Sequence, residues 1–311
     1  MSIRAGSPYY GKSLAFCEMK KRPITLIIPF FGPVPAWQPF FLKSCYANND
    51  VSFLIFADHI CPGIDRNVRV VQTNLEELRI RAMRKLQMNV SLESAYKICD
   101  FRPAFGLIFE EYLKDSWFWG TCDTDIVFGN IRKIVTDEVL ANYDIITAKR
   151  EYLVGHFTLY RNAAITNRLF LESADYREVF QSPRSYAFDE CNFLWWKLLS
   201  GGDILSTPSR IESMSHVVKR LTAKGRIRAY FESHVIEQDK LLANGSLEEL
   251  SNRLFWDNGV LYDQDDKTEY LSFHFHFLKK DPAFIIPFWK EVPNEFHISQ
   301  NGFSLTTKTF D

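Results

Sequence analysis

Residues 117–130 read WFWGTCDTDIVFGN, and this stretch decides the fold. The aromatic residues 117–119 predict the start of a buried strand, which ends just before Asp123 and Asp125. Residues i and i+2 of an extended segment point to the same side, so the two acids face one point. Burying two unpaired carboxylates costs several kcal/mol, which makes a cation their natural partner. A hard divalent ion, Mn²⁺ or Mg²⁺, suits these ligands and completes its coordination shell with phosphate oxygens and water.

A solvated turn is the common alternative for an Asp-x-Asp triplet. Here the triplet stands between two apolar runs, because Ile126, Val127 and Phe128 follow it directly. The tip of a surface turn rarely lies between two such runs. The surrounding sequence therefore favours a metal site.

The composition is that of a globular chain. Of its 311 residues, 46% are hydrophobic and 24% are charged, which excludes a disordered or membrane-spanning chain. The net charge of −1 creates no field that would attract nucleic acid, so we expect no nucleic-acid partner. Aromatic residues reach 15%, and we expect most of them to fill a bulky core.

The cysteine pattern indicates the cellular compartment. The six cysteines contain no CxxC pair, which favours reduced, buried thiols over a zinc site or a disulfide framework. They are Cys17, Cys45, Cys61, Cys99, Cys122 and Cys191. The first residues lack the apolar stretch of a signal peptide, and the longest apolar runs are short. We therefore expect a cytoplasmic protein.

The first half of the chain has the element order of an α/β protein. Buried strands are predicted at residues 24–29, 51–57 and 68–71, and helices at 37–48 and 75–86. Ligands bind at the carboxyl ends of such strands. Pro29 and Phe30, where the first strand gives way to a loop, and Asp58 after the second strand are therefore candidate nucleotide-binding residues.

Residues 94–113 predict a helix that breaks near Pro103 and leads into the acidic strand. Its polar positions are Tyr96, Lys97, Asp100 and Arg102. They form either one wall of a nucleotide pocket or an ordinary amphipathic face with a weak surface ion pair.

The run YKICDFRPAFGLIFEEYLKDSWFWGTCDTDIVFGNI, residues 96–131, resembles the core of the GT-A nucleotide-sugar glycosyltransferases. It is most similar to an uncharacterised bacterial family of polysaccharide glycosyltransferases, and more distantly to glycosyltransferase families 8 and 32. The shared layout is a helix with Asp and Arg that leads into a strand ending in Asp-x-Asp. The resemblance implies that Asp123 and Asp125 hold Mn²⁺ or Mg²⁺ against the donor diphosphate. Arg102 stands one place earlier than the arginine of that pattern.

The resemblance also implies a domain organisation. A single α/β domain of the GT-A type, with a mixed central sheet flanked by helices, is expected over residues 23–290. Residues 23–130 would form its nucleotide-binding half and residues 131–290 its acceptor half. Residues 1–22 are expected to be an irregular leader, and residues 291–311 a C-terminal tail.

Two places in the second half are candidates for the acceptor site. A strand is predicted at 155–161, where Gly155 would let a sugar approach the backbone and His156 would contact it, unless His156 is a core residue. Asp189 and Glu190 precede an apolar helix predicted at 191–199, where acids also favour a helix N-terminus. By resemblance, one of them, Asp189 before Glu190, acts as general base or stabilises a cationic sugar.

Residues 270–280, YLSFHFHFLKK, predict a strand with His274 and His276 on one face and three phenylalanines on the other. Paired imidazoles can bind a metal, and an amphipathic edge strand is the alternative. By resemblance to family 8, His274 or His276 completes the metal shell, and Lys279 or Lys280 neutralises the diphosphate. The segment that follows, residues 282–302, is expected to be mobile and to close the site.

The segment 216–230 is basic, with cations at Lys219, Arg220, Lys224, Arg226 and Arg228. It forms either a solvated face or a contact with anionic lipid or a polyprenyl-phosphate acceptor at the inner membrane.

These features predict a metal-dependent glycosyltransferase that uses a nucleoside-diphosphate sugar and a glycan or lipid-linked acceptor. Synthesis of bacterial lipopolysaccharide or capsule is the expected setting. A haloacid-dehalogenase-type phosphatase is the alternative enzyme, with Asp123 as nucleophile, Asp125 as acid/base, and Asp265 and Asp266 as the acidic pair. A non-catalytic sugar-binding protein is the third hypothesis. The sequence predicts no oligomeric state.

Overall fold

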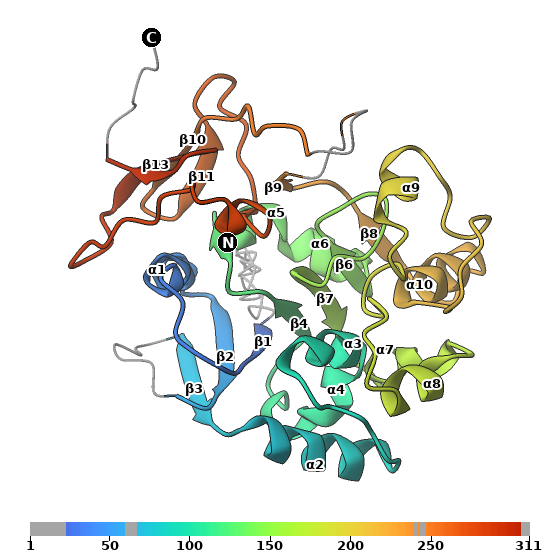
Figure 1. Ribbon diagram of the computed structural model, residues 1–311. Helices are drawn as coiled ribbons and strands as arrows, with labels where there is room; N and C mark the ends of the chain where they lie inside the picture. Colours follow the sequence, from blue (N-terminus) through green and yellow to red (C-terminus); the bar gives the residue numbers. More distant parts are fainter. Residues whose placement is uncertain (1–22, 60–66, 239–241, 243–246, 306–311) are drawn as a thin grey trace, which may run out of the picture.

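The computed structural model describes residues 23–59, 67–238, 242 and 247–305 (Figure 1). The expected leader, Cys17 and Cys61 lie outside these residues. Among the residues described, no helix has the length and apolar character needed to cross a bilayer.

A seven-stranded sheet in the order β3-β2-β1-β4-β7-β6-β8 forms the centre of the molecule. Its strands are β1 (Ile24–Phe30), β2 (Val51–Ala57), β3 (Val68–Gln72), β4 (Phe118–Cys122), β6 (Ile145–Thr147), β7 (Phe157–Arg161) and β8 (Ala229–Phe231). The first four are parallel, and β7 runs antiparallel to both β4 and β6. The expected mixed α/β architecture is confirmed, and β4, which leads to the acids, occupies its centre.

The hydrophobic pattern of β1 explains how both faces of this sheet are covered. Leu26 and Ile28 belong to one buried cluster, whereas Ile27 between them belongs to another. Successive side chains of a strand point to opposite faces, so the two clusters lie on opposite sides of the sheet. Helices cover both faces of such a sheet, which accounts for the nearly continuous apolar runs of β1 and β4.

Two of the predicted helices match their sequence patterns, and a third does not. α1 (Gln38–Ala47) and α2 (Leu75–Leu86) lie where they are expected. The helix expected at 94–113 is a series of short turns, since Pro103 lacks the N–H that would continue it. These turns are η1 (Ala95–Lys97), α3 (Ile98–Phe101), η2 (Arg102–Ala104), α4 (Phe105–Ile108) and η3 (Glu110–Tyr112).

The second half contains further short helices. They are α5 (Ile131–Ile134), α6 (Asp137–Asn142), α7 (Ala164–Asn167), η4 (Leu169–Glu172), α8 (Tyr176–Gln181), α9 (Trp195–Leu199), α10 (Met214–Ala223) and η5 (Leu278–Lys280). The helix predicted at 191–199 begins only at Trp195. Asn192 and Phe193 have φ of 52° and 63°, and a right-handed helix cannot include these angles.

Two smaller sheets complete the fold. β5 (Ile126–Phe128), β12 (Ser272–His274) and β9 (Val235–Glu237) form a three-stranded sheet in the order β5-β12-β9. β10 (Leu254–Asp257), β11 (Val260–Asp263), β13 (Glu295–Ser299) and β14 (Gly302–Ser304) form the other, at the red end of Figure 1.

The C-terminal part differs from the expectation in two ways. The strand predicted at 270–280 is limited to β12, and His276 lies beyond its end. Residues 295–304, within the range expected as a tail, form strands whose Phe296 and Phe303 are buried in a third apolar cluster with Phe40 of α1. This cluster packs the C-terminal strands against the first half of the chain.

Candidate active site

The candidate site lies where the central sheet meets the three-stranded sheet. Asp123 and Asp125 occupy the short link between β4 and β5. His274 ends β12, and the antiparallel register of β12 and β5 places it opposite Ile126. Strand pairing therefore brings His274 beside acids that are far away in the sequence.

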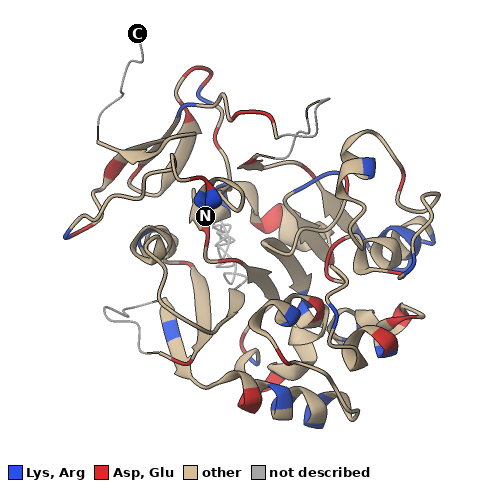
Figure 2. Ribbon diagram, in the orientation of Figure 1, with Lys and Arg blue, Asp and Glu red and all other residues tan. Residues whose placement is uncertain are grey.

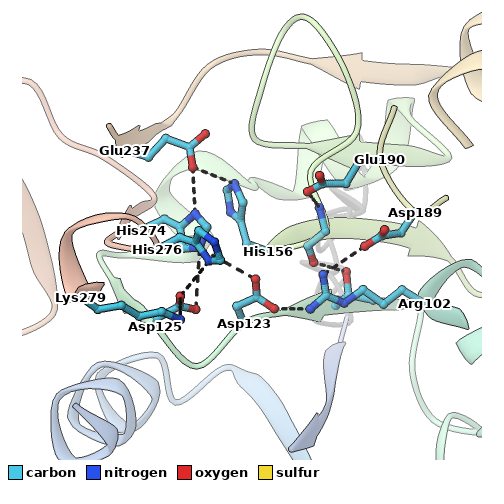
Figure 3. Close-up of polar contacts among 12 residues, drawn as sticks. Arg102, Asp123, Asp125, His156, Asp189, Glu190, Glu237, His274, His276 and Lys279 are labelled. Atoms are coloured by element: carbon cyan, nitrogen blue, oxygen red, sulfur yellow. Dashed lines mark hydrogen bonds and ion pairs between the residues drawn. The ribbon is translucent and has the colours of Figure 1, made fainter. Parts of the chain in front are cut away.

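Three side chains converge on Asp125 (Figure 3). The Nε2 atom of His274 lies 3.7 Å from Oδ1 of Asp125 and 3.9 Å from Oδ2 of Asp123. The Nδ1 atom of His276 lies 3.5 Å from Oδ2 of Asp125, and Lys279 forms an ion pair with the same oxygen. Ligand atoms of Asp125, His274 and His276 all lie within 4.8 Å of one another. The acids and histidines singled out in the sequence thus form one cluster.

This cluster could hold a divalent cation. His274 is 7% exposed, and its Nε2 atom is buried without a hydrogen-bond partner in the described part of the chain. A buried nitrogen that faces two carboxylates and makes no hydrogen bond calls for a ligand. Carboxylates suit Mg²⁺ and Mn²⁺, whereas imidazole prefers transition metals, so the mixed set fits Mn²⁺ better than Mg²⁺.

The charges of the cluster depend on one another. Burial opposes ionisation of Asp125, but His274, His276 and Lys279 outweigh it and hold the pKa of Asp125 well below its usual range. Burial likewise opposes the charge on His274, but Asp125 and Glu237 raise its pKa to about 10. Without a cation, His274 itself therefore carries the positive charge beside Asp125. A bound divalent ion would take the place of that proton.

Arg102 links this Asp–His cluster to a second pair of acids. One guanidinium nitrogen of Arg102 pairs with Asp123, and the other lies 3.1 Å from Oδ2 of Asp189. Burial, which Arg102 offsets only in part, raises the pKa of Asp189 well above its usual range. Gly155 packs against this arrangement, and a Cβ atom there would overlap both Arg102 and Asp189. The glycine thus makes room for the ion pair, where the sequence indicated the approach of a sugar.

Glu190 is held rigidly beside Asp189. Its Oε1 atom accepts a hydrogen bond of 2.8 Å from the N–H of Gly155, and its Oε2 atom accepts one of 2.7 Å from the indole of Trp195. Burial raises the pKa of Glu190 above its usual range.

The loop that carries Asp189 and Glu190 is strained. Ala187, Asn192 and Phe193 have φ of 46°, 52° and 63°, in the left-handed region that favours glycine. Each such residue costs about 1–3 kcal/mol, and such strain clusters at functional sites. This strain is a further reason to keep Asp189 and Glu190 as candidate functional residues.

A cavity of about 340 Å³ lies between the Asp–His cluster and these acids. Pockets for small ligands typically measure roughly 300–1,000 Å³. Its polar lining includes Arg102, Asp123, His156, Asp189, Glu190, Glu237, His274 and His276. Its apolar lining includes Tyr152, Val154, Trp195, Trp196, Leu199 and Phe277. Tyr96 also lines the cavity and is largely exposed.

Two predicted nucleotide-binding residues have a structural role. Lys97 is fully buried, lies 2.8 Å from Asp100, and donates to the carbonyl groups of Val179 and Arg184. Asp100 borders the cavity and also accepts hydrogen bonds from the backbone N–H groups of residues 186 and 188. The pair fastens the loop before Asp189 to α3, so Lys97 has no donor left for a nucleotide.

Other predicted residues lie apart from the cavity. Asp58 accepts a hydrogen bond of 3.2 Å from the N–H of Gly32 at the end of β1, and it does not line the cavity. Pro29 and Phe30 do not line the cavity either. Lys280 lies 3.0 Å from Nε2 of His276, whereas Lys279 reaches Asp125.

His156 lies at the cavity but is 3% exposed, and neither ring nitrogen has a hydrogen-bond partner among the described residues. Its ring centroid lies 4.2 Å from that of His274. Burial, together with the charge of His274, lowers the pKa of His156 to about 3, so the imidazole is neutral.

The sequence did not point to Glu237 or Lys149. The Oε2 atom of Glu237 lies 2.8 Å from Nδ1 of His274, and its other oxygen forms an ion pair with Lys149. Glu237 ends the three-residue strand β9, and Lys149 follows β6. No local pattern distinguishes either residue from a surface charge.

The acidic pair that a phosphatase of the alternative type requires does not lie at this site. Asp265 forms an ion pair with Arg253, and Asp266 accepts a hydrogen bond from the N–H of Thr268. Neither residue lines the cavity. Asp123 also follows the fourth strand of the described residues, whereas the phosphatase motif follows the first strand of its domain.

The basic segment 216–230 is largely paired with acids. Arg220 lies 2.8 Å from Glu212, Arg226 lies 3.0 Å from Glu172, and Arg228 lies 3.8 Å from Asp144. Around α10, basic segments (blue) and acidic segments (red) both occur (Figure 2). The contact with anionic lipid therefore gains no support from this segment.

A family model described as "Family of unknown function (DUF6625)" matches residues 26–307. The chain belongs to this family. No curated protein matches the DUF6625 chain in sequence. Because the family description assigns no activity, the function has to be inferred from the site.

Several solved structures are similar to part of this chain. A crystal structure of the galactosyltransferase LgtC with donor and acceptor sugar analogues is 13% identical, covers 54% of this chain and 71% of its own, and has a TM-score of 0.36. An active-site mutant of LgtC is 11% identical over 62% and 83%, with a TM-score of 0.35. Mouse xyloside xylosyltransferase 1 in its apo form is 11% identical over 68% and 78%, with a TM-score of 0.30.

Proposed function

We propose that this DUF6625 protein is a metal-dependent glycosyltransferase, which moves a sugar from a nucleoside-diphosphate sugar to a glycan or lipid-linked acceptor. One observation carries the proposal. Asp123, His274 and His276 line one wall of a cavity, with Asp125 against both histidines, and Asp189 and Glu190 line the other wall. The resemblance of residues 96–131 to the GT-A core supports the same assignment.

The metal wall would bind the donor diphosphate. Asp123, Asp125, His274 and His276 would hold Mn²⁺ or Mg²⁺, and the ion, when bound, neutralises charge on the diphosphate leaving group. Lys279 adds a compact positive charge beside Asp125, 5.0 Å from the ring of Trp37. A lysine at this place would stabilise the negative charge that develops on the diphosphate as the sugar leaves.

The acid wall would bind the sugars. Arg102 orients Asp189, whose free lone pairs can accept a hydroxyl proton or stabilise a cationic sugar. Glu190 already accepts two hydrogen bonds, so it serves to position the loop. Trp195, Trp196 and Phe277 supply apolar faces for sugar rings and help to exclude water.

The biological setting is part of the proposal. The sequence resemblance favours bacterial lipopolysaccharide or capsule synthesis, with the enzyme on the cytoplasmic side of the membrane. The donor half would be residues 23–130 and the acceptor half residues 131–290. The metal site draws on both halves, because Asp125 precedes β5 and His274 ends β12.

A screen of nucleotide sugars tests this function. The protein is incubated with each donor in Mn²⁺ or in EDTA, and release of the nucleoside diphosphate is measured. We expect release from at least one donor in Mn²⁺ only, with loss of activity in Asp125→Asn. Asp137→Asn, which alters a partly exposed ion pair with Arg132, is the matched control. Activity on phosphomonoesters with a phosphorylated Asp123 would overturn the proposal in favour of a phosphatase.

A further inference from the structure

Glu237 touches the metal cluster without being one of its proposed ligands. We propose that Glu237 is a positioning residue, which holds His274 so that the Nε2 atom faces Asp123 and Asp125. The inference rests on the metal site of the proposed function and adds a residue from β9 to it.

The strand ladder builds this contact into the backbone. β12 pairs in parallel with β9 on one side and antiparallel with β5 on the other. In this register His274 stands beside both Glu237 and Ile126, the residue after Asp125. Directly paired positions of neighbouring strands project their side chains to the same face. The ladder therefore sets Glu237 and His274 together at the cavity.

The hydrogen bond decides which nitrogen of His274 keeps its proton when a cation replaces the other proton. Its Nδ1 atom lies 2.8 Å from Oε2 of Glu237, and a carboxylate can only accept. The Nδ1 atom therefore carries the proton, and Nε2 is the nitrogen that faces the acids. Metal-bound imidazoles generally donate their other N–H to a carboxylate, which orients the ring and makes it a better ligand.

The side chains of Lys149 and His156 favour the hydrogen bond between Glu237 and His274. Lys149, itself buried, forms an ion pair with the second oxygen of Glu237. The Nε2 atom of His156 lies 3.6 Å from Glu237, too far for a hydrogen bond, so Glu237 bonds His274 instead. Ligand atoms of His156, Glu237 and His274 also cluster within 4.8 Å, but the ammonium of Lys149 opposes a second cation there.

A metal titration tests the inference. Binding of Mn²⁺ to the full chain is followed by the electron paramagnetic resonance signal of the free ion. In Glu237→Gln the affinity should fall by roughly 10–100-fold, the usual effect of losing a carboxylate that orients a metal-bound histidine. Glu269→Gln is the matched control, since it removes a Glu–Lys pair, with Lys133, on the surface. Its affinity should equal that of the wild type.

A spectroscopic measurement on the wild type gives an independent test if Glu237→Gln fails to fold. With Cd²⁺ bound, long-range ¹H–¹⁵N correlations should show the proton of His274 on Nδ1 and none on Nε2. A proton on Nε2, or unchanged Mn²⁺ affinity in Glu237→Gln, would overturn the inference and leave the metal site standing. A wild type that binds no Mn²⁺ would overturn both.

Discussion

Gly155 lies where any side chain would collide with Arg102 and Asp189. In Gly155→Ala we expect the free energy of unfolding to fall by about 1–3 kcal/mol, because overpacking forces neighbours out of place. We also expect weaker Mn²⁺ binding, since Arg102 would shift against Asp123. Urea denaturation and a Mn²⁺ titration measure the two effects.

Gly225→Ala separates loss of stability from damage to the site. Gly225 has φ of 66° and no atom near its missing Cβ, so alanine there costs backbone strain of about 1–2 kcal/mol. Its Mn²⁺ affinity should stay that of the wild type. If Gly155→Ala also bound Mn²⁺ normally, the close packing of Gly155 against the ion pair would have no role in the site.

At the scale of elements, the N-terminus of α10 depends on a neutral histidine. The Nδ1 atom of His216 accepts a hydrogen bond of 3.2 Å from the N–H of Ser213, and the Ser213 side chain accepts one from the N–H of His216, so the two residues form a capping box. Burial lowers the pKa of His216 from 6.5, although Glu212 and Asp175 act against it. Protonation would remove the acceptor and open the box.

Acidification should therefore destabilise the protein through His216. Because its pKa is lower in the folded state, the unfolded chain binds more protons below pH 6.5, and stability falls as the pH falls. His216→Gln keeps a capping-box acceptor that does not titrate. Between about pH 7.5 and 5.5, the wild type should lose stability relative to this variant, by at most about 1.4 kcal/mol per pH unit. Parallel urea-denaturation profiles for the two proteins would contradict this role.

The bounds of the helices and strands could be predicted from the sequence only in part. Local patterns predict the bounds of β2 and α2 correctly. The apolar run of β2 and the helical period of α2 each extend over the whole element. The short turns of residues 95–112 could not be predicted, since tertiary packing decides how far each turn continues beside Pro103. Propensity alone does not settle such boundaries.

The candidate site could be predicted only in part. Asp-x-Asp and His-x-His are local signals: Asp123, His274 and His276 line the cavity, and Asp125 clusters with both histidines. The role of Glu237 could not be predicted from the sequence, because it depends on the pairing of β9 with β12. Lys97 is predicted at the nucleotide pocket, but the fold buries it against Asp100 and two backbone carbonyls, which no local pattern indicates.

At the scale of the whole molecule, the C-terminal strands pack against the segment that carries His274 and His276. Phe303 of β14 stacks on Phe40 of α1 with ring centroids 4.3 Å apart, and it packs edge-on against Phe275, next to His274 and His276. The third apolar cluster thus connects the end of the chain to the strand that carries the histidines.

Phe303→Ala should lower the free energy of unfolding by about 3–5 kcal/mol, because it leaves a cavity in this cluster. Phe288→Ala is the matched control: this ring is fully exposed, at 100%, and its removal should change stability by about 0.5 kcal/mol or less. Chemical denaturation measures both. Equal effects in the two variants would show that the C-terminal strands contribute little to the core.

The most direct test of the metal site is an anomalous difference map from crystals of the protein grown with Mn²⁺. The site predicts one strong peak bounded by Asp123, Asp125, His274 and His276, with Lys279 beside it. The peak should vanish in Asp125→Asn. A map with no peak there, while His274 still lies against Asp125, would contradict the proposed metal site.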